Sequence, residues 1–186
     1  SKEDYLKANF LIKQMANSEH RQFKAQDKLY RGLHSVPANV FLDLCRPGES
    51  YNIGAMASMS SFQSEAAKFA AEKTGNRYRI IYLVTNPKGK GTPISALSAY
   101  PPEMEVVLGG DIKIERFSFG PVLRELSKEL QDKWRSHGNI AEFKDLVEFV
   151  EEVETSARGT SESPGVERYS LSTIEVGLAY VFATVL

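Results

Sequence analysis

Three short stretches of the sequence carry side chains that could do chemistry together. They are, in chain order, Arg31-Gly32, Ser58-Met59-Ser60 and Glu103-Met104-Glu105. An arginine presents a planar fork of donors that fits a phosphate and cannot lose its charge. Glycine lets the backbone approach a ligand closely. Glu103 and Glu105 are two residues apart, so in an extended segment both carboxylates point to one side, where their repulsion should raise one pKa.

Each stretch alone has an ordinary structural explanation. A lone arginine is usually a surface ion-pair partner, a serine-rich run before a helix is usually an N-cap, and an isolated Glu-x-Glu is usually a solvated strand face. What favours a joint site is that all three occur in one chain and in this order. Paired carboxylates could then take up a proton or stabilise a developing positive charge.

The combination resembles the arginine-serine-glutamate class of mono-ADP-ribosyltransferases, found among bacterial toxins and in some phage and animal enzymes. The resemblance covers roughly residues 28–119, about half of the chain. The matching stretches are Leu29 to Leu33, Ser58 to Ser60 with Ala66, Ala67 and Phe69 behind them, and Ser98 to Leu108. Met59 departs from the threonine that the family usually has, and Gly109-Gly110 from its proline and basic residues.

This resemblance implies that the chain binds NAD, as a substrate that is consumed. Arg31 would anchor the phosphates, and the backbone at Gly32 would lie against the nicotinamide amide. Ser58 would hydrogen-bond the ribose, and Ser60 would support the same turn. Phe62 has two interpretations, as a ring that stacks on nicotinamide or as an ordinary core or surface aromatic.

The resemblance also assigns roles to the acidic pair and to the residue before it. Glu105 would stabilise the oxocarbenium-like ribose as the nicotinamide bond breaks. Glu103 would hold the acceptor arginine and take its proton during attack. Tyr100 would contact the target protein, where an aromatic ring can stack on a guanidinium, or it is a plain loop tyrosine. Neutral nicotinamide leaves, and no metal is needed.

The implied function is therefore mono-ADP-ribosylation of an arginine on a target protein. A toxin or effector of this kind would be secreted or injected and act in the cytoplasm of the target cell, and an immunity or inhibitor protein could bind it. Two alternatives remain open. One is an NAD glycohydrolase that passes ADP-ribose to water, and the other is a non-catalytic interaction domain on the same fold.

The elements that must position these residues follow an α+β order. Residues 28–31 are expected to form a strand that ends at Gly32, and residues 62–71 a helix. Residues 78–84 have the β-branched and aromatic character of a buried strand. Residues 105–108 and 111–117 are expected to form two strands of a hairpin that turns at Gly109-Gly110. The family resemblance adds the architecture, two roughly perpendicular antiparallel sheets around an NAD cleft with flanking helices.

The remaining segments are predicted from periodicity and composition. Residues 2–17 should form an amphipathic helix, and residues 35–54 a loop. Beyond Gly120, Pro121 should start a helix with an apolar stripe at Val122, Leu126, Leu130 and Trp134. A second stripe follows at Ile140, Phe143, Leu146, Val147 and Val150, then a polar loop over 155–165 and a strand-like end over 168–186. The 186 residues are expected to form one catalytic domain, with a core at 28–119 and an extension at 120–186.

Composition limits the other possibilities. The net charge is −1 and the pI about 6.3, which favours neither a nucleic-acid nor a membrane partner. Cys45 is the only cysteine, so no internal disulfide can form. His20, His34 and His137 show no metal-ligand spacing, although His34 lies close enough to Arg31 for a secondary role. We find no phosphate-binding glycine fingerprint and no apolar stretch long enough to span a bilayer.

Overall fold

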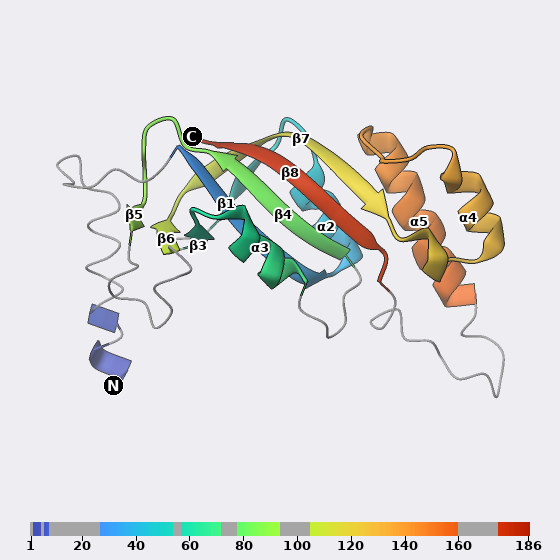
Figure 1. Ribbon diagram of the computed structural model, residues 1–186, viewed down its shortest axis with the longest axis horizontal. Coiled ribbons are helices and arrows are strands. Elements are labelled where there is room, and N and C mark those ends of the chain that lie inside the picture. Colours follow the sequence, from blue (N-terminus) through green and yellow to red (C-terminus); the bar gives the residue numbers. More distant parts are fainter. Residues whose placement is uncertain are drawn as a thin grey trace.

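Eight strands form one mixed sheet in the computed structural model of this chain (Figure 1). The structure describes residues 2–4, 6–7, 27–53, 57–71, 78–93, 105–159 and 175–186. The strands lie in the order β2-β7-β8-β4-β1-β3-β6-β5. Their bounds are β1 Lys28–Val36, β2 Ser50–Asn52, β3 Ala57–Ser60, β4 Tyr78–Thr85, β5 Thr92–Pro93, β6 Glu105–Leu108, β7 Asp111–Pro121 and β8 Gly177–Val185.

The sheet has two parts that meet at a single residue pair. β2, β7, β8, β4 and β1 form the larger part, with long ladders and one parallel pair, β4 with β8. β3, β6 and β5 form the smaller part. The link between them is Tyr30 of β1 opposite Ser60 of β3. The α+β class is confirmed, but the two groups of strands are joined into one sheet rather than separate, and they are not wholly antiparallel.

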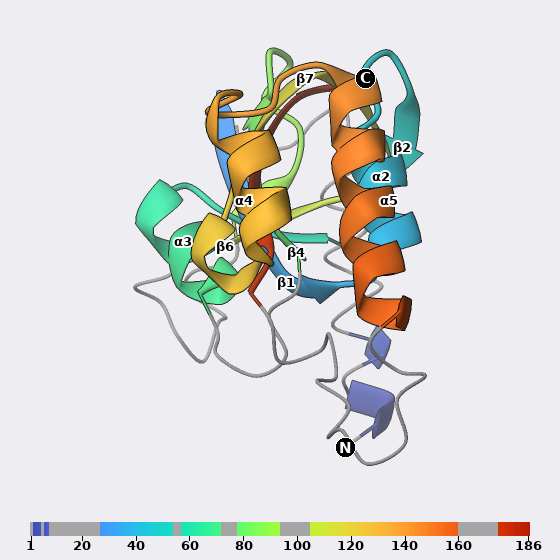
Figure 2. The ribbon, with the colours of Figure 1, turned by 90° about the vertical axis from the view of Figure 1, so that its right-hand side faces the viewer.

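Helices cover the two faces of the larger part unequally (Figure 2). α2 (Ala38–Cys45) and α5 (Phe143–Gly159) lie on one face, and α3 (Gln63–Ala70) lies on the other. α4 (Lys128–Arg135) follows a short 3-10 turn, η2 (Leu123–Glu125), and lies at the end of the molecule beside α5.

The main core fills the space between the sheet and the α2/α5 layer. Its fully buried rings stack closely: Phe41 lies 4.7 Å from Tyr78 and 5.4 Å from Phe119, between ring centroids. Phe149 of α5 packs against Phe119 at 5.3 Å. A smaller cluster under α3 contains Ala66, Ala70 and Ile81. Burial of this much aromatic and aliphatic surface is the main stabilising term for the fold.

Two predictions of irregular structure are wrong. Residues 35–54 were expected to be a loop, but they contain α2 and β2. Pro37 can precede a helix, and its carbonyl accepts the first helical hydrogen bond, from the Phe41 amide at 2.8 Å. Phe41, Leu44 and Cys45 then fall on one buried helical face. Residues 155–159, expected to be a loop, continue α5, whose buried face includes Phe149 and Val153.

Two predicted connections also differ from the structure. β6 and β7 do not form a hairpin, because β6 pairs with β3 and β5 while β7 pairs with β2 and β8. Gly109-Gly110, with φ +98° at Gly110, instead carries the chain from the small part of the sheet to the large one. Pro121 ends β7 and does not start a helix. The helix begins later, after Ser127, whose hydroxyl accepts from the Leu130 amide.

Other predictions are confirmed within the described residues. α3 covers most of the predicted 62–71 helix, and β4 extends the predicted strand by one residue. β1 begins at the predicted residue but runs on past Gly32. β8 lies inside the predicted 168–186 strand. Of the predicted helix at 2–17, residues 2–4 and 6–7 are helical and the rest lies outside the described residues.

Candidate functional site

The candidate site lies where the two parts of the sheet meet. Arg31 is on β1, next to Tyr30, the residue that pairs with Ser60 of β3. The Arg31 guanidinium crosses to β3, where its Nη1 donates to the backbone carbonyl of Ser58 at 2.9 Å. Arginine has five N–H donors in a rigid fork. This contact fixes the side chain of Arg31 and uses one donor.

Gly32 is required where β1 passes under α3. A Cβ built at this position would lie 1.9 Å from the Ala66 carbonyl oxygen and 2.9 Å from the Ala70 amide nitrogen. Both atoms belong to the helix backbone, which cannot move aside as a flexible side chain could. The absence of a side chain at Gly32 therefore lets α3 rest directly on β1. Its predicted contact with nicotinamide stays a prediction.

Ser60 shapes the turn from β3 into α3. Its hydroxyl oxygen accepts from the Phe62 amide at 3.0 Å, and the side chain is 7% exposed. Phe62 itself is the N-cap residue and makes no side-chain cap bond. The role predicted for Ser60 at an NAD site stays a prediction. The contact itself is a common one, because serine hydroxyls often bind the backbone just before a helix.

A cleft opens between this turn, β1 and α3. Its volume is about 240 Å³. Its lining is made of side chains and backbone from Tyr30, Arg31, Gly32, Ser58, Met59, Ser60, Ala66 and Phe69. Four of the predicted site residues, Arg31, Gly32, Ser58 and Ser60, are thus brought to one cavity.

The aromatic residues in the cleft lining are Tyr30 and Phe69, and Phe62 is not among them. Phe62 is 48% exposed and is not part of the lining, whereas Phe69, 46% exposed, is. From the sequence, Phe69 is expected only on the helix behind the serines. Its spacing of three residues from Ala66 places both on one helical face, but that spacing does not show which strand the face lies against.

Glu105 lies on β6, the strand next to β3. It is the first residue of β6, and it pairs with Ser60, which in turn pairs with Tyr30. Neighbouring strands lie about 4.8 Å apart, so the backbone at Glu105 is about two strand spacings from β1. The side chain of Glu105 lies outside the described part of the structure, as do Glu103 and Tyr100. Their predicted roles stay predictions.

Arg31 has a buried tyrosine as its neighbour on the adjacent strand β4. Tyr82 of β4 is the register partner of Arg31 and is 2% exposed. Burial raises the pKa of its hydroxyl, the nearby Cys45 and Tyr51 raise it further, and the Arg31 charge opposes them. Within the described residues the Tyr82 hydroxyl has no hydrogen-bond partner. Tyr82 therefore stays neutral and contributes no charge beside Arg31.

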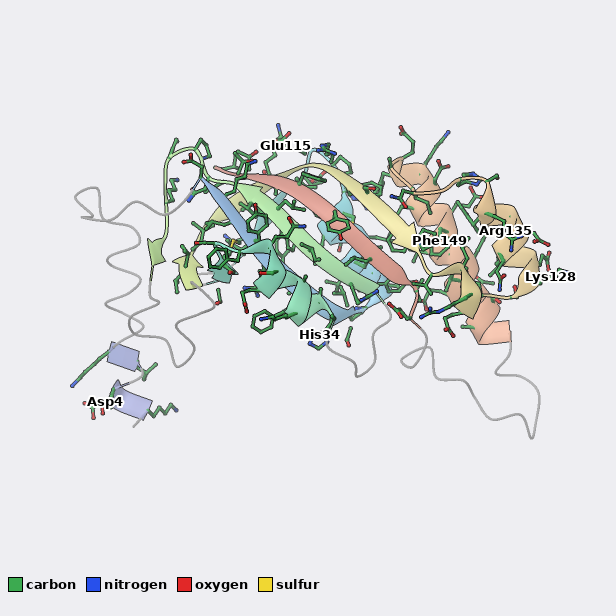
Figure 3. All side chains as sticks on the ribbon, in the orientation of Figure 1. Asp4, His34, Glu115, Lys128, Arg135 and Phe149 are labelled. Carbon is green, nitrogen blue, oxygen red and sulfur yellow. The ribbon has the colours of Figure 1, made fainter. Side chains whose placement is uncertain are left out.

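Other candidate residues lie apart from the cleft. His34 is not in its lining; its Nδ1 lies 3.1 Å from the Ser35 hydroxyl, and Figure 3 shows it below α3. The Cys45 thiol is buried, which raises its pKa. Across the described ranges, no group of three His, Cys, Asp or Glu side chains could hold a metal ion. No helix there is long and apolar enough to cross a membrane.

No protein-family model and no curated protein sequence matches the chain. Among solved structures, the chain is similar to the ADP-ribosyltransferase Vis in complex with agmatine, with 12% identity and a TM-score of 0.45, over 98% of this chain and 71% of Vis. It is also similar to the Salmonella SpvB ATR domain, with 15% identity and a TM-score of 0.46, over all of this chain and 76% of that domain. The ADP-ribosyltransferase HopU1 of Pseudomonas syringae matches at 21% identity and a TM-score of 0.36, over 51% of this chain and 39% of HopU1.

Proposed function

We propose that this chain is a mono-ADP-ribosyltransferase that moves ADP-ribose from NAD to an arginine of a target protein and releases nicotinamide. The observation that carries the proposal is the shared cleft of Arg31 and Ser58, with Glu105 two strands from β1 in the same small ladder. The arginine-serine-glutamate pattern in the sequence gives these three residues complementary roles.

In this proposal the chemistry proceeds through a cationic ribose. Arg31 holds the phosphates of NAD, and Ser58 hydrogen-bonds the ribose. The bond between the ribose carbon and nicotinamide breaks, and its electron pair leaves with neutral nicotinamide. Glu105 stabilises the positive charge that develops on the ribose. A nitrogen of the acceptor guanidinium then forms a new bond to that carbon, and its proton passes to Glu103.

The same proposal extends to partners and place of action. We propose that residues 1–186 act as one catalytic domain and that the target protein presents its arginine near Tyr100 and Glu103. An effector or toxin role fits such an enzyme, secreted or injected and active in the cytoplasm of the target cell, with an immunity or inhibitor protein as a further partner. No metal is required in this scheme.

Nicotinamide release and acceptor labelling test the proposal together. The purified chain is incubated with NAD, first alone and then with agmatine, a small guanidinium compound. Glu105→Gln should lower nicotinamide release about 10²–10³-fold, because an uncharged amide stabilises the cationic ribose poorly. The exposed Glu115 of β7 offers a matched control, and Glu115→Gln should leave the rate unchanged.

Glu103→Ala separates transfer from hydrolysis. A transferase should lose agmatine modification in this variant while it keeps some NAD cleavage, because water needs no carboxylate to hold it as the cationic guanidinium does. A wild-type chain that cleaves NAD but never modifies agmatine or a protein would favour the glycohydrolase. A chain that leaves NAD intact throughout would favour the non-catalytic interaction domain and refute the proposal.

A further inference from the structure

One face of the sheet is only partly covered by the described helices. α3 packs on this face against β1 and β4, and Figure 1 shows no helix in front of β8 and β7. The small cluster under α3 still reaches Leu178 and Tyr180 of β8, but not Phe182. Strands with one solvated face normally alternate apolar and polar residues. β8 instead places Leu178, Tyr180 and Phe182 on this face, half-buried.

Strand register arranges the side chains of this face in rows that lead to the cleft. One row runs from Tyr30 through Leu83 and Phe182 to Arg116, across four adjacent strands. Tyr30 lines the cleft. Three strand spacings, about 15 Å, therefore separate the cleft side of this row from Arg116. The next row runs from Lys28 through Thr85 and Thr184 to Lys113.

The cations of these two rows carry no carboxylate partner among the described residues. Lys28, Lys113 and Arg116 are exposed and make no ion pair there. Arg116 lies over the Phe182 ring at 3.7 Å and so covers it with a cationic group. In contrast, Lys68, Lys133 and Arg79 are all paired with glutamates.

Two acidic groups near the ends of these strands already have partners. Asp111 accepts a hydrogen bond from the Asn52 amide at 2.9 Å. Glu175 pairs with Arg79 and lies 3.7 Å from Arg124. Glu115 is exposed, next to Arg116 in the chain, and falls at the register irregularity between Ile114 and Arg116. Within the described residues, the two rows thus present three cations without an ion-pair partner, one of them over the Phe182 ring.

We propose that this face, defined by Lys28, Lys113, Arg116, Phe182 and Thr184, is the docking surface for an acidic, aromatic-containing segment of the target protein. The inference rests on the proposed function, since it assigns the surface to the protein that receives ADP-ribose. A segment docked across Phe182 and Arg116 lies beside the cleft without entering it. Complementary charge speeds the encounter and selects the partner more than it tightens the complex.

Peptide binding tests the surface independently of catalysis. The probe is a fluorescent peptide of alternating Glu and Tyr, measured by anisotropy at low salt, with a Lys-Tyr peptide as its counterpart. The wild-type chain should bind only the acidic peptide, and binding should weaken at about 0.5 M salt because exposed charges are then screened. The double variant Lys113→Glu with Arg116→Glu should bind it about tenfold more weakly. The single variant Arg116→Gln should show a smaller loss.

A matched charge reversal serves as the control. Lys128 and Lys144 are exposed on α4 and α5, and Figure 3 shows Lys128 at the far end of the molecule. Lys128→Glu with Lys144→Glu changes the net charge equally and should bind the acidic peptide as the wild type does. Equal binding by both double variants, or no binding by the wild type, would overturn the docking surface.

Activity then connects the surface to the target. The Lys113/Arg116 variant should modify agmatine at the wild-type rate but label proteins of a cell lysate about tenfold more slowly. Wild-type protein labelling by that variant would refute the docking role while NAD cleavage still supported the proposed function. A wild type that binds the acidic peptide but never cleaves NAD would refute the proposed function, and with it the assignment of this surface to an ADP-ribosylated target.

Discussion

At the scale of single residues, the side chains and the glycine that line the cleft have different roles. Arg31 and Ser58 are the polar residues that we propose bind NAD, whereas Gly32 contributes by having no side chain. Because Gly32 lies against the α3 backbone, the strand with Arg31 and the helix with Phe69 both line one cleft. The geometry of the polar groups therefore depends on a packing contact.

Gly32→Ala tests this packing contact. The new methyl group would overlap the Ala66 carbonyl, and α3 would have to move, so the free energy of unfolding should fall by about 3 kcal/mol or more. Gly120→Ala on β7 is the control, because its methyl would lie 3.4 Å from Asn139 Oδ1 and should cost less than about 1 kcal/mol. Urea denaturation measures both. A Gly32→Ala protein as stable as the wild type would show that the helix moves freely.

Cys45 should give the protein a specific weakness at alkaline pH. Burial raises the pKa of its thiol in the folded state. Above roughly pH 8.5 the thiol of the unfolded chain loses its proton while the folded one keeps it. The unfolded state then binds fewer protons, so the free energy of unfolding should fall as pH rises, by about 1.4 kcal/mol per pH unit from this group.

The slope with pH identifies the thiol. Cys45→Ala should lower the free energy of unfolding at neutral pH because it leaves a small cavity. Between pH 9 and pH 10, however, the free energy of unfolding of this variant should fall less steeply than that of the wild type. Buried Tyr82 acts in the same direction at higher pH in both proteins. Identical slopes for wild type and variant over this range would rule out Cys45 as the cause.

At the scale of elements, the strands and helices with strong local patterns were predictable, and their pairings were not. β4 and α3 follow from composition, and β8 from its apolar run. α2 was missed because Pro37, Pro47 and Gly48 flank it, although Phe41, Leu44 and Cys45 have helical spacing. The β6–β7 hairpin was wrong because glycines mark a turn without specifying which strand comes next.

The site was predictable to a similar degree. The sequence order of Arg31, Ser58 and Glu105 predicted one joint site, but not the strand β3 that carries Ser58 or the pair between Tyr30 and Ser60 that joins β3 to β1. Phe69 was not predicted in the cleft, because only the crossing of α3 over Gly32 brings it there. Long-range contacts of this kind have no local pattern in the sequence.

The α4–α5 pair offers a prediction at this scale. Trp134 is 1% exposed, packs on Phe149 at 5.3 Å, and its Nε1 donates to Glu152 Oε2 at 2.7 Å. Trp134→Phe removes that donor and part of the ring, and should lower the free energy of unfolding by about 1–3 kcal/mol. NAD cleavage at a temperature where the variant is folded should not change. A large loss of cleavage would place α4 in the catalytic machinery.

At the scale of the whole molecule, the segment after Gly120 belongs to the sheet itself. β8 lies between β7 and β4, with nine of its residues paired to β7 and eight paired to β4. Its inward residues, among them Ala179 and Val181, are completely buried. The segment that sequence analysis set apart as an extension therefore supplies a central strand.

A chain that ends at Phe119 should fail to fold. Without β8, the edges of β4 and β7 would each carry unpaired backbone groups, and the apolar surface beneath α5 would be exposed. The expected result is loss of a cooperative urea transition and of NAD cleavage, against the full chain as control. The full-length variant Val181→Asp, which buries a charge in the same strand, should be strongly destabilised as well. A folded, active fragment would contradict this account.

The place of β8 also sets an order of events during synthesis. β8 lies between β7 and β4, which both precede it in the chain. These two strands can therefore be joined into one sheet only after residues 177–185 have been synthesised. A ribosome-bound or partly threaded polypeptide would hold its earlier strands as an incomplete ladder. The sheet that carries the cleft is therefore complete only after β8 has formed between β7 and β4.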